Sequence, residues 1–244
     1  MRRQRSRQQL LAGVRRLWRA TPVDWEVTPR PIPHATAMQR MDAIANAVAA
    51  GERPELAWLL EHEPVITAGT SARPEDLLQP DAMDVVQTGR GGQYTWHGPG
   101  QRVAYLMLNL KRRGSDVRAY VAALEQWIID TLADFGIAAF RDEELVGVWT
   151  RTANGDKAKI AAIGVRVSRG VTRHGMALNV HPDLSWQHRV IVPCGVREHG
   201  VTSMQALGLK PRMEAVDAAL HRHFERIFGP VRQAGQGGLK KRGE

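Results

Sequence analysis

The single cysteine of the chain, Cys194, is the residue whose type and setting first suggest chemistry. It stands in the segment VIVPCGV, where the proline should end a strand and the glycine frees the backbone just after the thiol. This setting predicts a sulfur on a tight bend that faces a cleft. A free thiol has a pKa of about 8.5, so a nucleophilic cysteine needs a neighbour that favours the thiolate. A small buried hydrophobe is the competing interpretation.

Histidines and lysines are the side chains that could activate this thiol. His97 and His174 each precede a glycine, although both also suit polar positions in turns or in the core. Lys159 begins the run KIAAIG, whose alanines and glycine leave room for a ligand beside the backbone. Lys157 lies two residues earlier and would share the same face of a strand, so the choice between the lysines is open. We favour Lys159 because it directly adjoins the apolar run.

The stretch RGGQYTWHGPG, at 90–100, combines four glycines with arginine, tyrosine, tryptophan and histidine side chains. A plain turn does not need that chemistry. Glycines let the backbone approach a thin ligand, and the larger side chains can form the walls of a slot. The stretch therefore predicts a slot for a thin ligand.

Other kinds of site fit the sequence less well. Four histidines lie near Cys194 in sequence, but no pair has the tight spacing of zinc ligands, so we expect no metal. The glycine-rich stretch also lacks the Gly-Lys-Ser/Thr ending of a nucleotide-binding P-loop. A cysteine–histidine hydrolase stays open as an alternative, since Cys194 and two candidate histidines are present.

The elements that must position these residues can be read from the spacing of apolar side chains. Turn signals at Asn154-Gly155 and Arg169-Gly170 predict hairpins. The order of elements predicts an α+β fold, a mixed β-sheet packed with helices that we expect on one face. The expected helices cover 38–51, 116–135 and 212–228. The expected strands cover 55–61, 65–67, 85–88, 103–109, 146–150, 160–167, 171–180 and 190–192.

Length and charge indicate one domain with basic ends. The chain has 244 residues and a formal net charge of +9. Residues 1–19 contain seven arginines and no acid, and residues 229–244 have a net charge of +3, which leaves −1 for residues 20–228. We therefore expect a flexible basic extension at 1–29, a single catalytic domain at 30–228 and a basic tail at 229–244.

The same totals exclude some partners. The nearly neutral body has no basic stripe interleaved with aromatic residues, so we expect no nucleic acid. No apolar run is long enough to cross a bilayer, so we expect no membrane partner. A lone cysteine suits a reducing compartment, and we expect a cytoplasmic protein.

Several separated motifs together resemble those of the lipoyl/octanoyl transferase family. The resemblance covers roughly residues 35–210 and keeps the order and spacing of the motifs. Trp96 stands where the family commonly has tyrosine, and Val196 replaces a common isoleucine. The motifs are EHEPVITAGT (61–70), RGGQYTWHGPGQ (90–101), KIAAIGVRV (159–167), RHGMALNV (173–180) and PCGV (193–196).

The resemblance implies a fold similar to the biotin/lipoate protein ligase catalytic domain. It also implies an acyltransferase that moves an octanoyl or lipoyl group to a lysine, with no metal and no cofactor. Cys194 would be the acyl-thioester nucleophile, and Lys159 would lower the pKa of its thiol. The implied substrate-binding residues are Arg90, Gly91, Gly92, Gln93, Tyr94, Thr95, Trp96, His97, Ala162, Ile163, Gly164, Gly175, Met176 and Ala177.

The resemblance implies protein partners as well. The donor would be octanoyl-loaded acyl carrier protein. The acceptors would be lipoyl domains of 2-oxoacid dehydrogenase complexes and the glycine cleavage H protein. An ATP-dependent lipoate-protein ligase on the same fold is the nearest rival, although it would need no cysteine nucleophile. A non-catalytic protein that binds acyl groups or lipoyl domains is a rival from another class, and the presence of both Cys194 and Lys159 argues against it.

Overall fold

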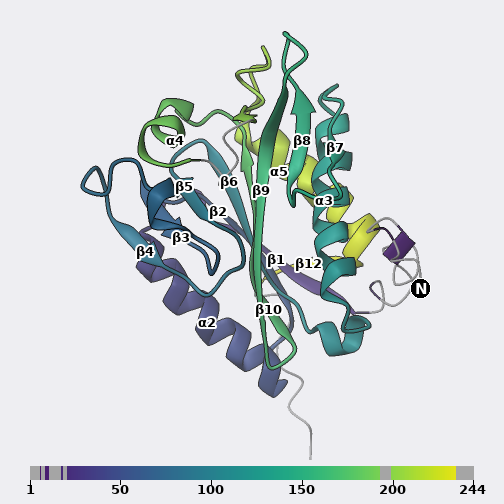
Figure 1. The fold of residues 1–244 in the computed structure, drawn as a ribbon. Coiled ribbons are helices and arrows are strands. Elements are labelled where there is room, and N and C mark those ends of the chain that lie inside the picture. Colours follow the sequence, from purple (N-terminus) through teal and green to yellow (C-terminus); the bar gives the residue numbers. More distant parts are fainter. Residues whose placement is uncertain (1–5, 7–8, 11–17, 19–20, 193–198, 235–244) are drawn as a thin grey trace, which may run out of the picture.

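A mixed sheet forms the centre of the molecule (Figure 1). The computed structural model describes residues 6, 9–10, 18, 21–192 and 199–234. Within these residues the larger sheet has nine strands in the order β12-β1-β2-β6-β10-β9-β8-β7, with β11 paired to β9. Its strands are β1 (Val23–Val27), β2 (Leu56–Leu60), β6 (Gln101–Met107), β7 (Phe140–Arg141), β8 (Val148–Arg151), β9 (Lys157–Ser168), β10 (Val171–Asn179), β11 (Gly200–Val201) and β12 (Val231–Gln233).

The long hairpin of β9 and β10 is the part of the sheet that carries most of the predicted site residues. The two strands pair antiparallel, with Gly175 opposite Gly164 and Ala177 opposite Ala162. The chain turns at Arg169 and Gly170, which both have positive φ angles, of 55° and 83°. This turn, and the strands expected at 160–167 and 171–180, are confirmed.

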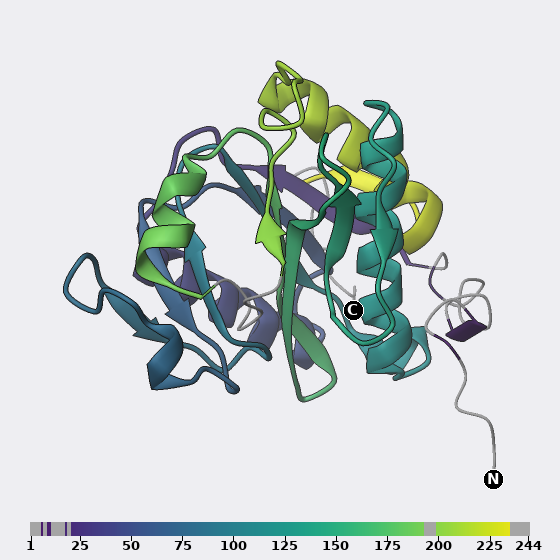
Figure 2. The ribbon, with the colours of Figure 1, turned by 45° about the horizontal axis from the view of Figure 1, so that its top comes forward.

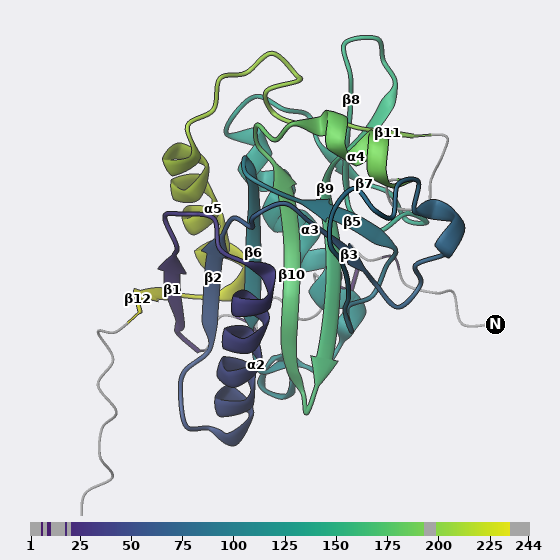
Figure 3. The same ribbon diagram turned by 90° about the vertical axis from the view of Figure 1, so that its left-hand side faces the viewer.

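Helices cover both faces of the larger sheet (Figure 3), so the expectation that they lie on one face is wrong. Helix α2 (His34–Ala50) packs its apolar residues on Leu56, Trp58 and Val103. Helices α3 (Val117–Ala133) and α5 (Met213–Phe228) pack together on the other side of the sheet (Figure 2). The sequence pattern defines an apolar face on each helix but does not say which face of the sheet receives it.

Local signals explain where the helices begin and end. The Asp116 side chain accepts a hydrogen bond from the Ala119 N–H and caps α3, as its position before the apolar pattern predicts. Gly51 ends α2 in a left-handed conformation, with φ of 79°. The helices expected at 38–51, 116–135 and 212–228 are therefore confirmed to within a few residues.

A second, small sheet lies on the α2 face, with strands β3 (Val65–Ala68), β4 (Val85–Gln87) and β5 (Tyr94–His97). Strand β5 lies inside the glycine-rich stretch at 90–100, where the sequence analysis predicts no strand. The expected strand at 190–192 is also wrong, because Val190 ends helix α4 (Leu184–Val190) and Ile191 makes only an isolated bridge to Leu77. Short helical turns occur at η1 (Pro74–Asp76) and η2 (Leu110–Arg113).

The folded unit extends beyond 30–228 at both ends. Strand β1 lies within 1–29 and pairs in parallel with β2 and with β12, which itself lies within 229–244. Trp18 is buried and stacks on Phe228, with ring centroids 5.5 Å apart. The predicted boundaries therefore need correction. They rest on the net charge of the terminal segments, which does not take account of the apolar residues in those segments. None of the helices in the described parts of the chain is both long and apolar enough to cross a membrane.

Candidate active site

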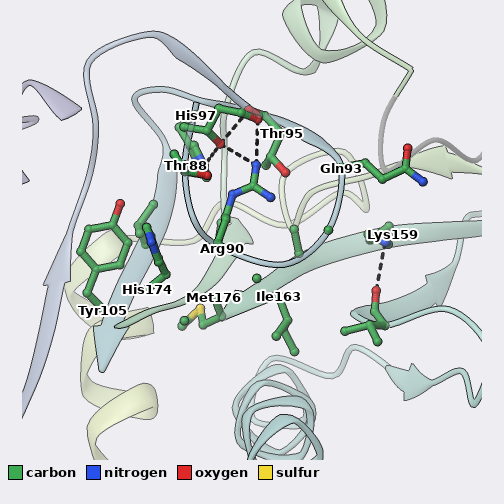
Figure 4. A pocket seen from close by; sticks show the side chains of 18 of the residues that line it. Thr88, Arg90, Gln93, Thr95, His97, Tyr105, Lys159, Ile163, His174 and Met176 are labelled. Atoms are coloured by element: carbon green, nitrogen blue, oxygen red, sulfur yellow. Dashed lines mark hydrogen bonds between the residues drawn. The ribbon is translucent and has the colours of Figure 1, made fainter. Parts of the chain in front are cut away.

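A pocket of about 190 Å³ lies between the small sheet and the β9–β10 hairpin (Figure 4). The small sheet and the loop before β5 form its roof, and the middle of the hairpin forms its floor. The lining residues are His34, Thr67, Thr88, Arg90, Gly92, Gln93, Thr95, His97, Val103, Tyr105, Glu144, Leu145, Val146, Lys159, Ala162, Ile163, Gly164, His174, Gly175, Met176 and Ala177.

The floor of the pocket is made of small residues. Two cross-strand pairs form it, Gly164 with Gly175 and Ala162 with Ala177. A Cβ atom on Gly164 would stand 2.9 Å from Cδ of Arg90, so the loop above approaches the floor only because this residue has no side chain.

Ile163 and Met176 also line the pocket, but Figure 4 shows that their side chains point away from it, and both pack in the core on the α3 side of the sheet. Their contribution to the pocket is therefore mainly backbone.

An irregularity in β9 brings Lys159 to the pocket face. Val148 of β8 pairs with Ala161, whereas the next residue, Trp149, pairs with Lys159, so β9 carries one extra residue there. Such a β-bulge changes the face to which the following side chains point. Lys159 and Ala162, three residues apart, consequently line the same pocket, which strict alternation would not allow.

The two candidate lysines share one neighbour and differ in the others. Both amines lie over the ring of Trp149, at 4.6 Å from its centroid for Lys159 and 4.5 Å for Lys157. The Lys159 side chain is buried, and its Nζ atom donates to the carbonyl of Val146 at 3.1 Å. Lys157 instead pairs with Asp142 at 2.5 Å and does not line this pocket. Its hydrogen bond lowers the pKa of the Asp142 carboxyl to about 2. The positions of the two amines support the choice of Lys159.

The roof is held by the buried guanidinium of Arg90. Its Nη2 atom donates to the carbonyl and the hydroxyl of Thr67, at 2.8 and 2.6 Å. The neighbouring Gly91 N–H donates to the carbonyl of Val165 in β9 at 3.0 Å. The glycine-rich loop is thus tied to both the small sheet and the hairpin.

A buried polar chain runs from the roof toward β11. Nδ1 of His97 lies 2.6 Å from Oε1 of Gln101, whose amide donates to Asn179 at 2.9 Å. The Asn179 amide then donates to the carbonyl of Thr202 at 3.0 Å. Burial, together with the nearby His62 and Arg90, holds the pKa of His97 well below its usual value, so this ring is neutral at pH 7.

Aromatic and imidazole rings gather at the end of the pocket away from Lys159. The hydroxyl of Tyr105 lies 2.7 Å from Nε2 of His62, and the rings of Tyr105 and His174 meet edge to face at 5.7 Å. Burial lowers the pKa of His62 to about 4 and that of His174 to about 3. Burial also lowers the pKa of His34, whose ring lies 5.2 Å from that of His62. This end is polar but carries no histidine charge at neutral pH.

The structure brings most of the predicted substrate-binding residues to one pocket, and three of them lie elsewhere. Gly91 uses its N–H in the bond to Val165. Tyr94 and Trp96 pack in a separate apolar cluster with Ile191, and together with Lys159 they line a smaller neighbouring pocket.

Sequence reasoning missed several lining residues. His34, Thr67 and Tyr105 are not among the predicted site residues, and the sequence suggests His174 only as a possible partner of the thiol. Thr67 lies within the EHEPVITAGT motif, which was the available signal for it. The positions of His34 and Tyr105 depend on how α2 and β6 pack, which no local pattern reveals.

Cys194 lies outside the described residues, in the gap 193–198. The ends of that gap are described. The Val192 N–H donates to the carbonyl of Asp76 at 2.8 Å, and β11 pairs with β9 so that Val201 lies opposite Lys159. The pairing of Cys194 with Lys159 stays a prediction. Within the described part of the chain, no group of three histidine or acidic residues could hold a metal ion.

The fold is that of a lipoate-ligase type of catalytic domain. A bipartite lipoate protein ligase from Thermoplasma acidophilum superimposes with a TM-score of 0.64 at 16% identity, over 87% of this chain and 86% of that one. A lipoate-protein ligase A bound with ATP gives a TM-score of 0.60 at 17% identity, over 87% of each chain. At these identities the likeness concerns the fold alone.

The sequence assigns the family. Residues 33–225 match the family model of the lipoyl protein ligase A/B catalytic domain, and the chain belongs to this family. A protein named octanoyltransferase from Paramagnetospirillum magneticum is 55% identical over 208 residues, which cover 85% of this chain and 98% of that protein. One of the same name from Caulobacter vibrioides is 53% identical over 218 residues, 88% and 96% of the two chains. The family resemblance seen in the motifs is confirmed.

Proposed function

We propose that the protein is an octanoyltransferase, which moves an octanoyl group to a lysine of a lipoyl-dependent enzyme domain in protein lipoylation. The observation that carries the proposal is the pocket, which has a floor of small residues and a buried lysine beside it. It occurs in a chain that is 55% identical to a protein named octanoyltransferase.

The pocket suits a thin acyl chain. Ala162, Gly164, Gly175 and Ala177 leave space directly above the sheet, and Val103 adds an apolar wall. Each methylene that the chain buries there contributes about 0.8 kcal/mol, so most of the affinity would come from the acyl group itself. A chain bound along the floor would present its carbonyl near the Lys159 amine.

The first chemical step is acyl transfer to the enzyme. The Cys194 thiolate attacks the thioester carbonyl of octanoyl-loaded acyl carrier protein and forms a new C–S bond. The bond to the carrier's thiol breaks, and that thiol leaves after taking a proton. The Lys159 ammonium can supply this proton.

The second step releases the product. A lysine amine of the acceptor attacks the acyl-enzyme carbonyl, an amide bond forms and the C–S bond to Cys194 breaks. Neutral Lys159 takes the proton that the amine loses. The thioester supplies the activation, so the reaction needs no ATP.

The electrostatic role of Lys159 can be sized. Opposite charges about 4 Å apart attract by about 4 kcal/mol at an effective dielectric constant of 20, before desolvation is subtracted. Each pKa unit corresponds to about 1.4 kcal/mol, so a shift of one to three units is within reach. Such a shift would bring the thiol into the working pH range.

The proposed partners are those that the family implies. The acceptors are lipoyl domains, such as those of 2-oxoacid dehydrogenase complexes and the glycine cleavage H protein. A cytoplasmic setting is supported by the single cysteine, since a reducing compartment keeps a nucleophilic thiol free.

A transfer assay without ATP tests the proposal. We expect octanoyl-carrier protein and a lipoyl domain to give the octanoylated domain, detected by intact mass, with the same yield after ATP is removed enzymatically. The Cys194→Ala variant is the control and should give no product. Transfer of free octanoate that depends on ATP would instead identify a ligase, and tight binding without turnover would identify a non-catalytic protein.

A further inference from the structure

The end of the pocket opposite Lys159 is closed by two rings. Tyr105 and His174 both line the pocket, and Figure 4 shows them on the far side of Arg90 from Lys159. Only 4% of Tyr105 and 6% of His174 is exposed, so an acyl chain that reaches them cannot continue into solvent. We call these two side chains the end wall.

The end wall is braced from behind. The Tyr105 hydroxyl is hydrogen bonded to His62, and its ring lies edge to face against Trp58 at 6.1 Å. The His174 ring stands at 88° to the ring of Tyr105. The backbone N–H of His174 donates to the sulfur of Met41 at 3.1 Å, which connects the chain at this position to α2. A turn of the Tyr105 ring would break its contacts with His62 and Trp58, and a turn of either ring would break the edge-to-face contact between Tyr105 and His174.

The backbone of His174 is held in an unfavourable conformation. Its φ angle is 58°, in the left-handed region that residues other than glycine rarely adopt, although β10 keeps its register with β9 there. Glycine would be the expected residue at such a position. A histidine is therefore held at the end of the pocket against its backbone preference, which indicates that the side chain has a role there.

The spacing of the strands gives the length of the space. Tyr105 pairs with Gly175, which pairs with Gly164, so the end wall lies level with Gly164. Lys159 lies five residues earlier, and one of these residues is the bulge. At about 3.3 Å per residue, the four to five remaining steps span roughly 13–17 Å. An extended octanoyl chain has eight carbons joined by bonds of about 1.5 Å and is roughly 9–10 Å long. A van der Waals contact of about 4 Å between its terminal methyl group and the end wall brings the total to the lower end of this span.

We propose that Tyr105 and His174 determine acyl-chain length by meeting the terminal methyl group of an eight-carbon chain. This rests on the proposed function, since it takes the reacting carbonyl to lie near Lys159. Both rings are neutral at pH 7, so they can contact a methyl group without exposing a charge to it. Longer chains are excluded because their last carbons have no space, and shorter chains leave the end of the pocket unfilled.

Truncating the end wall tests this directly. The kcat/KM values for octanoyl-, decanoyl- and dodecanoyl-carrier protein are compared in wild type, Tyr105→Ala and His174→Gly. The glycine variant removes the ring and also suits the φ of 58°. We expect the decanoyl-to-octanoyl ratio to rise about tenfold in each truncated variant, since two more methylenes become buried. Tyr105→Phe keeps the ring and should keep the wild-type ratio.

The matched control is Leu106→Ala. Leu106 is fully buried next to Tyr105 on β6, but it packs in the core on the α3 side of the sheet. The Leu106→Ala variant should be less stable than wild type, but its decanoyl-to-octanoyl ratio of kcat/KM should be unchanged. Thermal melts confirm that each variant is folded. Ratios within twofold of wild type in both folded truncation variants would overturn the inference alone. A wild-type protein that transfers no acyl chain would overturn the proposed function, and the inference with it.

Discussion

At the scale of residues, the site depends on which of two neighbouring lysines faces the pocket. The sequence places Lys157 and Lys159 on the same face of a strand and cannot separate them. The structure separates them by their partners, a carboxylate of Asp142 for Lys157 and a carbonyl of Val146 for Lys159. Neither partner lies close in sequence, which is why the preference for Lys159 could not be argued from electrostatics beforehand.

Lys159→Met should make the Cys194 thiol harder to ionise. We expect the midpoint of its alkylation rate against pH to move upward by about 1–3 pH units, because the variant lacks the positive charge that the proposed mechanism pairs with the thiolate. Lys157→Met is the matched control, and it should shift the midpoint less because that ammonium is already paired with Asp142. Iodoacetamide labelling across pH measures both. Equal shifts in the two variants, or none for Lys159→Met, would contradict the assignment.

Trp149 should act through Lys159 by holding its amine. The Lys159 amine lies 4.6 Å from the indole centroid, and the indole N–H donates to the carbonyl of Leu145, beside the carbonyl that Lys159 contacts. The Lys157 amine lies 4.5 Å from the same centroid, but its charge is already paired with Asp142. In Trp149→Leu we expect the alkylation midpoint to move upward by about 0.5–1 pH unit, because a cation–π contact of about 1 kcal/mol is lost. Trp149→Phe keeps an aromatic face and should fall between wild type and the leucine variant. No shift in either variant would show that the ring does not position the amine.

At the scale of elements, local patterns predict the parts of the fold that local interactions stabilise. Helix α3 follows from its cap at Asp116 and its apolar face, and the β9–β10 hairpin follows from its turn and apolar runs. Helix α4 has only seven residues, too few for a helical period to emerge. Strand β5 depends on pairing with β3, which no pattern within the glycine-rich stretch reveals.

The bulge in β9 is another feature beyond local prediction. It requires β8 to pair with a shifted register, and it decides that Lys159 shares a face with Ala162. Residues from three of the predicted segments, 90–97, 162–164 and 175–177, line the pocket. The sequence could not say which side chains of each segment face it, as Ile163 and Met176 show.

Gly175 tests the close packing of the floor. A Cβ atom there would lie 2.3 Å from the backbone oxygen of Ala104, so Gly175→Ala requires β6 and β10 to move apart. We expect the free energy of unfolding to fall by about 1–3 kcal/mol, as for an overpacked core. In Gly200→Ala the added atom meets nothing within 4 Å, and the change should stay within about 0.5 kcal/mol. Urea unfolding at pH 7 measures both variants, and equal midpoints would refute the packing argument.

At the scale of the whole molecule, one buried arginine connects distant parts of the chain. Arg113 forms a buried ion pair with Glu55 and donates to the carbonyls of Trp18 and Phe228. Of these residues, Trp18 belongs to the segment 1–29 that the sequence analysis expects to be a flexible extension. The net charge of the N-terminal segment does not predict where the domain begins, because a few buried apolar side chains and backbone groups determine this boundary.

Arg113→Met should destabilise the whole protein. Removing one partner leaves the Glu55 carboxylate buried without its cation, and we expect a loss of about 3–5 kcal/mol in the free energy of unfolding. Arg222→Met breaks a half-exposed pair with Asp134 and should cost less than about 1 kcal/mol. Chemical denaturation compares the two. Similar losses for both variants would mean that the Arg113 contacts do not hold these segments together.

The central claim is that the reaction passes through an acyl group on Cys194, and intact mass spectrometry tests it most directly. Enzyme mixed with octanoyl-carrier protein, without an acceptor, should gain the mass of one octanoyl group, which hydroxylamine removes. The Cys194→Ser variant should carry no hydroxylamine-labile adduct. A wild-type enzyme that turns over while carrying no adduct, or that carries one in the serine variant at another residue, would contradict the account.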